Sequence, residues 1–134
     1  MKNGFTLVEL LAVLIILAVI SLISVPVITD VIDNSKKNSI KVSIEHYIDA
    51  INAEIANQEL IGEYETLDGT YIISSNGKTL TRDENTILNI DYNGDVLKDG
   101  NVEISSGIVV QLNNVIIDEW TIKIESGKVV LLDN

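Results

Sequence analysis

The distribution of apolar and polar residues divides the chain into three stretches, and the first is the most apolar. Residues 10–28 read LLAVLIILAVISLISVPVI, in which only Ser21, Ser24 and Pro26 depart from aliphatic side chains. A helix needs about 20 such residues to cross the hydrocarbon core of a membrane. The pattern therefore predicts a membrane-spanning helix close to the N-terminus.

In the second stretch, apolar residues recur at steps of three and four, which indicates one apolar stripe on a helix. The stripe consists of Val31, Ile32, Ile40, Ile44, Tyr47, Ile48, Ile51 and Ile55. No glycine follows before Gly62, so we predict one continuous helix from about Phe5 to about Leu60. Its second half should bury the stripe beneath a small domain.

The third stretch alternates short β-type segments with turn residues. The predicted strands are Tyr71–Ile73, Ile87–Ile90, Val102–Ile104, Ile108–Val110, Trp120–Ile124 and Val129–Leu132. The predicted turns lie at Asn76-Gly77, Asn93-Gly94, Asp99-Gly100, Ser106-Gly107, Asn113-Asn114 and Ser126-Gly127. Strands this short favour an antiparallel meander, whose apolar face should pack on the helix. The expected fold class is α+β, a long N-terminal helix packed against a small antiparallel sheet.

Pro26 lies inside the predicted helix and removes the hydrogen bond to the carbonyl of Leu22. We expect a kink or a locally weak turn there. Ser21 and Ser24 are expected to help satisfy the freed backbone groups.

Composition excludes several kinds of chemistry. The 134 residues carry a net charge of −11, contain no cysteine and include one histidine, His46. No thiol site, multi-histidine metal site or catalytic triad is expected, and no cofactor or enzymatic activity is predicted. Because proteins bind nucleic acid mainly through Lys and Arg, direct nucleic-acid binding by the isolated domain is disfavoured, although a local patch at Lys36, Lys37 and Lys41 leaves it open.

Asp91, Asn93 and Asp95 place oxygen ligands at alternate positions, as at the start of a calcium loop. The glycine is misplaced for such a loop and its closing glutamate is missing. An Asn-Gly hairpin between two strands explains the same residues more simply, so these three are retained only as a weak metal candidate.

Glu9 is the one charge between Phe5 and Ile28. A carboxylate near the middle of a membrane helix costs about 2.5–3.5 kcal/mol on insertion scales. Its position calls for a compensating partner.

Residues 4–9, Gly-Phe-Thr-Leu-Val-Glu, resemble the processing motif of type IV prepilins and pseudopilins, and Pro26 also stands where that family's pattern places it. The resemblance implies a pilin-like fold and a prepilin peptidase that cuts after Gly4 and methylates the new amino terminus of Phe5. It also implies that Glu9 of one subunit meets the Phe5 amine of a neighbour. An unpaired buried charge is costly, so this pair would set the register of assembly. Alternatively, Glu9 only favours the positive end of its helix.

The resemblance divides the chain into a leader (1–4), a hydrophobic transmembrane and polymerisation helix (5–28) and a globular domain (29–134), the last comprising the amphipathic helix half (29–61) and the sheet region (70–132). The expected function is that of a structural subunit of a type IV pilus or related filament. The alternatives are a pseudopilin of a type II secretion or competence system, and a single-pass membrane-anchored binding domain. Expected partners are sister pilins, the peptidase, the assembly platform and the membrane. The precursor is expected in the cytoplasmic membrane, and the product in a cell-surface or periplasmic or cell-wall filament.

Overall fold

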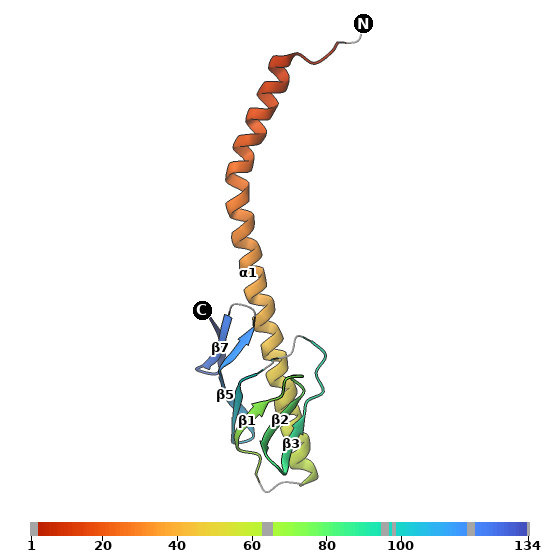
Figure 1. The fold of residues 1–134 in the computed structure, drawn as a ribbon, viewed down its shortest axis with the longest axis vertical. Helices are drawn as coiled ribbons and strands as arrows, with labels where there is room; N and C mark the ends of the chain where they lie inside the picture. Colours follow the sequence, from red (N-terminus) through yellow and green to blue (C-terminus); the bar gives the residue numbers. More distant parts are fainter. Residues whose placement is uncertain (1–2, 63–65, 95–96, 98, 118–119, 134) are drawn as a thin grey trace. The chain divides into compact units, whose positions relative to one another are not determined.

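The computed structural model describes residues 3–62, 66–94, 97, 99–117 and 120–133. They form two compact units, residues 1–37 and 38–134, and a single helix, α1 (Leu7–Ile61), contributes to both. Figure 1 shows α1 as an uninterrupted coil that is followed in the sequence by β-strands. The predicted α+β fold class, with an apolar N-terminal helix, is confirmed.

Helix α1 begins two residues later and ends one residue later than the sequence pattern predicted. Its end is set by Gly62, which has a positive φ of 70° and donates its N–H to the carbonyl of Gln58 over 3.1 Å. Glycine tolerates this left-handed conformation, so it can close the last turn of a helix. The helix runs through Pro26 without interruption.

The prediction that Ser21 and Ser24 serve the backbone groups freed by Pro26 is wrong. The Ser21 hydroxyl donates to the carbonyl of Leu17, and the Ser24 hydroxyl donates to that of Ile20, both over 2.8 Å. Each serine therefore bonds the carbonyl four residues before it, which is the usual local partner of a helical serine.

The C-terminal unit contains two antiparallel sheets. The larger has the order β3-β2-β1-β4-β5 and the smaller has the order β6-β7-β8. The strands of the larger are β1 (Gly69–Ile73), β2 (Thr79–Asp83), β3 (Thr86–Asn89), β4 (Asn101–Ser105) and β5 (Ile108–Asn113). Those of the smaller are β6 (Val115–Ile117), β7 (Trp120–Glu125) and β8 (Lys128–Asp133).

The prediction of a single meander is wrong. Strands β1, β2 and β3 follow one another in the sheet, but β4 pairs with the opposite edge of β1. The chain after β3 therefore crosses to the far side of β1, and Asn93-Gly94 does not join two paired strands. The predicted hairpin at this position is consequently wrong as well.

Two predicted turns have the geometry that short hairpins require. Ser106 and Gly107 connect β4 to β5 with φ values of 56° and 74°, and Ser126 and Gly127 connect β7 to β8 with 53° and 75°. Two consecutive positive φ angles give a turn whose twist matches that of the flanking strands. These two hairpin predictions are confirmed.

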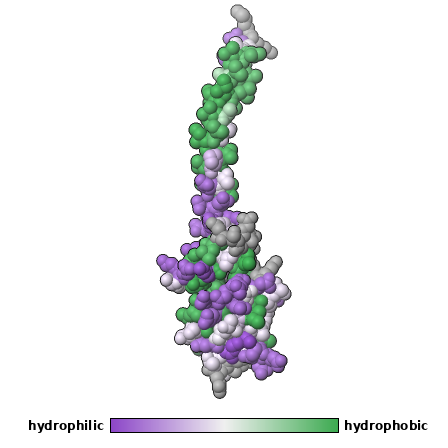
Figure 2. Space-filling view, turned by 60° about the vertical axis from the view of Figure 1, so that its left-hand side comes forward, coloured by the Kyte–Doolittle hydropathy of each residue, from purple (hydrophilic) through white to green (hydrophobic). Residues whose placement is uncertain are grey.

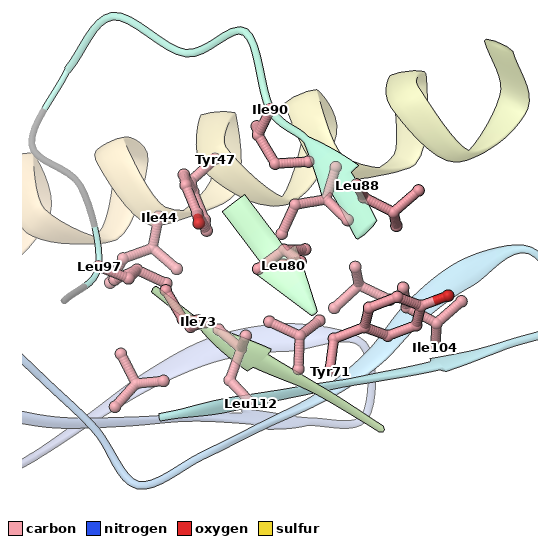
Figure 3. Close-up of a cluster of buried hydrophobic side chains, with 14 of the residues drawn as sticks. Ile44, Tyr47, Tyr71, Ile73, Leu80, Leu88, Ile90, Leu97, Ile104 and Leu112 are labelled. Atoms are coloured by element: carbon pink, nitrogen blue, oxygen red, sulfur yellow. The ribbon is translucent and has the colours of Figure 1, made fainter. Parts of the chain in front are cut away.

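The hydrophobic core of the C-terminal unit lies between α1 and the sheets (Figure 3). From the predicted helical stripe, Ile44, Tyr47, Ile51 and Ile55 are buried, and Ile40 and Ile48 pack partly against them. The sheets contribute residues such as Tyr71, Leu80, Leu88, Ile104 and Leu112. Val31 and Ile32, which the sequence pattern also assigned to this stripe, are exposed.

Candidate assembly site

The segment before α1 is extended and accessible. Residues 3–6 have no helical structure, and the Phe5 side chain is 88% exposed. A Cβ atom placed on Gly4 would meet no other atom within 4 Å. The peptide bond between Gly4 and Phe5 therefore lies in open backbone ahead of the first helical residue, which is the kind of segment that proteases cut most readily.

Thr6 and Glu9 begin the helix through three reciprocal hydrogen bonds that involve their side chains. The Thr6 backbone N–H donates to Glu9 Oε2 over 2.8 Å, and the Thr6 hydroxyl donates to the same oxygen over 2.9 Å. In return, the Glu9 backbone N–H donates to Thr6 Oγ1 over 3.2 Å. This arrangement is a capping box, and it satisfies two backbone donors that the first helical turn leaves without partners.

The capping box gives Glu9 a partner within its own chain, which the sequence analysis missed. Its signal is the Thr-x-x-Glu spacing of residues 6–9, placed directly before an apolar helix. Both hydrogen bonds to the carboxylate reach Oε2, and no described residue donates one to Oε1. A carboxylate accepts several hydrogen bonds at once, so the capped Glu9 retains an oxygen for another donor.

The N-terminal half of α1 has its apolar side chains uncovered. By length and composition, α1 contains one segment apolar enough to cross a membrane, and none of that segment is buried. Figure 2 shows the apolar residues as a continuous surface along this part of the helix. Uncovered apolar surface on this scale needs lipid or other protein around it.

A second surface feature lies wholly in the C-terminal unit, as a groove of about 690 Å³ between α1 and the strands β5, β7 and β8. Its apolar lining includes Ile48, Val109 and Ile124. Two exposed carboxylates of α1, Glu45 and Asp49, also line it. The groove is thus apolar and acidic at once, and no sequence signal in the strands indicated it.

The weak calcium candidate is only partly described. Asp91 and Asn93 are exposed, and Asp95 lies outside the described residues. Within the part of the chain that the structure describes, no group of three or more His, Asp or Glu side chains is arranged to hold a metal ion. His46 is exposed on α1.

The uncovered apolar helix, which is long enough to span a membrane, fits a precursor that is anchored through its N-terminal helix. Residues 1–25 match the family described as the prokaryotic N-terminal methylation motif. That motif is the hallmark of type IV prepilins and pseudopilins, and it implies processing by a prepilin peptidase and assembly as a structural subunit. No curated protein and no solved structure significantly matches the chain.

Proposed function

We propose that this chain is a structural subunit of a type IV pilus or a related filament. A prepilin peptidase cuts it after Gly4 and methylates the new amine of Phe5, and the subunit then polymerises through residues 5–28. The methylation motif over residues 1–25 carries the proposal. The extended backbone at Gly4 and the uncovered apolar helix support it.

In the proposed filament, the Phe5 amine of one subunit binds Glu9 of another. Cleavage creates this amine, so the partner of the carboxylate appears only when the subunit is ready to assemble. Within a bundle of apolar helices water is scarce, and removing one member of a buried ion pair typically costs about 3–5 kcal/mol. The pair would therefore penalise any register in which either charge lacks a partner.

The test of processing is mass spectrometry of the protein from cells that have the peptidase. The expected product begins at Phe5 and carries a methyl group on its amine. A chain that still begins at Met1 in those cells would contradict the proposal and favour a permanently anchored membrane protein.

Two matched substitutions separate the charge of Glu9 from its part in the capping box. Glu9→Gln keeps an acceptor for the Thr6 N–H, because glutamine also completes a capping box, but it removes the charge. Thr6→Ala removes the hydroxyl and keeps the charge. Filament yield in sheared cell fractions should fall strongly for Glu9→Gln and remain near the wild-type value for Thr6→Ala. The reverse result would mean that helix initiation, and not the ion pair, limits assembly.

The same motif occurs in pseudopilins, so the process that the filament serves needs a separate assay. Deletion of the gene, followed by measurement of surface filaments, secreted proteins and DNA uptake, assigns the chain to one system.

We propose the membrane as the location of the precursor and the cell surface or cell wall as that of the filament. We also propose that the helix has a kink or a locally weak turn at Pro26 in the polymerised subunit.

A further inference from the structure

The sequence contains three Asn-Gly pairs, at residues 3–4, 76–77 and 93–94. An asparagine that precedes glycine is prone to a spontaneous reaction, because glycine has no side chain to hinder the approach of its backbone nitrogen to the asparagine amide. The reaction also needs a side chain and a backbone that are free to turn. The fold holds the two pairs of the C-terminal unit very differently.

The pair at 76–77 is locked in the turn between β1 and β2. The Gly77 N–H donates to the carbonyl of Ser74 over 2.8 Å, and the Gly77 carbonyl accepts from the Tyr47 hydroxyl. The side-chain oxygen of Asn76 accepts from the backbone N–H of Lys78 over 2.9 Å and from the Ser74 hydroxyl. Gly77 is also buried. The attacking nitrogen and the amide that it would attack are therefore both fixed.

The pair at 93–94 lacks these restraints. Both residues are exposed and lie outside the helix and the strands. Among the residues that the structure describes, none forms a hydrogen bond with the Asn93 side chain or with the Gly94 N–H. The Asn93 side chain is therefore free to turn toward the backbone nitrogen of Gly94, and water reaches both residues.

The packing of the domain favours glycine at position 94. A Cβ atom placed there would lie 2.5 Å from the hydroxyl oxygen of Tyr92. That hydroxyl donates to the carbonyl of Ser43 over 3.0 Å and lies 3.0 Å from Ser43 Oγ. The Tyr92 ring also contacts the ring of Tyr47 edge-on. Because Tyr92 is held in place, it resists a side chain at position 94, and the fold thus maintains the glycine that makes Asn93 reactive.

We propose that Asn93 is a site of spontaneous modification in the folded protein, which converts it through a cyclic imide into isoaspartate and aspartate, whereas Asn76 is protected. The backbone nitrogen of Gly94 forms a bond to Cγ of Asn93, the bond from Cγ to Nδ2 breaks, and ammonia leaves with the proton from the Gly94 nitrogen. Water then opens the ring. Attack at Cγ gives aspartate, and attack at the backbone carbonyl gives isoaspartate.

The modification changes both charge and backbone in the crossover from β3 to β4. Each product adds a negative charge to a chain that already carries −11. Isoaspartate also lengthens the main chain by a methylene group, which shifts Gly94 relative to the Tyr92 hydroxyl. The reaction depends on the C-terminal unit alone, so it takes place whether or not the chain enters a filament.

The test follows each Asn-Gly pair by peptide mass spectrometry in the purified, unprocessed full-length protein in detergent, incubated until a denatured sample is half converted. In the folded protein, Asn93 should react roughly tenfold or more faster than Asn76, because the hydrogen bonds of the locked turn must first break. Asn3, which is exposed in the extended segment, is the internal reference for an unrestrained pair. In denaturant, Asn76 and Asn93 should react at similar rates, because the fold then holds neither pair.

Two matched substitutions test the protection of Asn76. Tyr47→Phe removes the donor to the Gly77 carbonyl and should accelerate the reaction of Asn76 severalfold. Tyr92→Phe removes a hydroxyl that does not contact this turn and should leave the rate at Asn76 unchanged. A third variant, Asn93→Gln, should abolish the product at position 93, because a glutamine side chain would have to close a larger and less favourable ring.

The inference is overturned if Asn93 remains intact in the folded chain while Asn3 reacts, or if Asn76 and Asn93 react equally fast there. It is supported if Asn93 reacts first in the folded chain and the difference disappears in denaturant. Neither result bears on cleavage after Gly4 or on filament yield, which the experiments on processing and on Glu9 measure separately.

Discussion

The hydroxyl group of Tyr47 provides a sharp test of how α1 is attached to the sheet. Tyr47 is fully buried, and its hydroxyl donates to the carbonyl of Gly77, in the turn between β1 and β2, over 2.5 Å. Its ring contacts the ring of Tyr92 edge-on, with 5.3 Å between the centroids. Tyr47→Phe preserves the ring and its contact and removes only the donor.

The expected loss of stability follows from the buried carbonyl that the substitution leaves behind. Gly77 is itself buried, so water does not replace the lost donor. A buried polar group without a partner costs about 1–3 kcal/mol. We expect Tyr47→Phe to lower the free energy of unfolding by this amount at neutral pH.

The effect should disappear at high pH, because the hydroxyl is stabilised in its neutral form. Burial, with a smaller contribution from Tyr92, raises the pKa of Tyr47 from 10.0 to about 12. A raised pKa in the folded state means that the stabilisation is complete below pH 10 and is lost as the pH rises toward 12. Two pKa units correspond to about 3 kcal/mol. Phenylalanine has no such titration, so the difference between wild type and variant should shrink toward zero.

The assay is denaturant unfolding of the full-length protein in detergent between pH 8 and pH 12, followed by the fluorescence of the single tryptophan, Trp120. Tyr92→Phe is the control at neutral pH, because its half-buried hydroxyl bonds the side chain and carbonyl of Ser43. It should cost less than Tyr47→Phe. A difference between wild type and Tyr47→Phe that stays constant up to pH 12 would refute the reasoning.

Three further substitutions test the hydrophobic core and the loss of stability at acid pH. Ile51→Ala leaves a cavity at a fully buried position on α1 and should lower the free energy of unfolding by about 2–5 kcal/mol. Ile72→Ala, at a position that is 63% exposed, should change it by about 0.5 kcal/mol or less. Thermal unfolding measures both effects. The backbone N–H groups of Ser106 and Gly107 hold the pKa of Asp68 below its usual value of 3.8. The stabilisation from ionised Asp68 is present above that value and is lost as the pH falls through the lower pKa of the folded state. In Asp68→Asn, the free energy of unfolding should therefore fall less steeply as the pH is lowered, which denaturant unfolding at a series of acid pH values measures.

The helical stripe and most strands were predictable because their signals are local. Ile44, Tyr47, Ile51 and Ile55 repeat with the period of a helix, and all four are buried. The period itself says which face is covered. It does not say where coverage begins, and this is why Val31 was assigned to the stripe although it is exposed.

Strand β2 was missed because its own residues do not read as a strand. Its sequence, TLTRD, buries only Leu80, and Arg82 donates to the carbonyls of Thr66 and Asp68. The strand is held by antiparallel neighbours on both sides, β1 and β3. Stabilisation of this kind comes from cross-strand pairing and is invisible in a single segment. Strand β6 has three residues, too few to show alternation.

The position of β4 was unpredictable for a related reason. Turn residues show where a chain reverses direction, but they do not determine which strand the following segment pairs with. The chain reaches β4 through Leu97, which is fully buried, and Gly100, whose carbonyl accepts a hydrogen bond from the Ile73 N–H over 3.0 Å. The hydrogen bond joins residues 27 positions apart, and the burial of Leu97 likewise depends on the folded core. The N-terminal motif, in contrast, is contiguous, so sequence alone was enough to locate it.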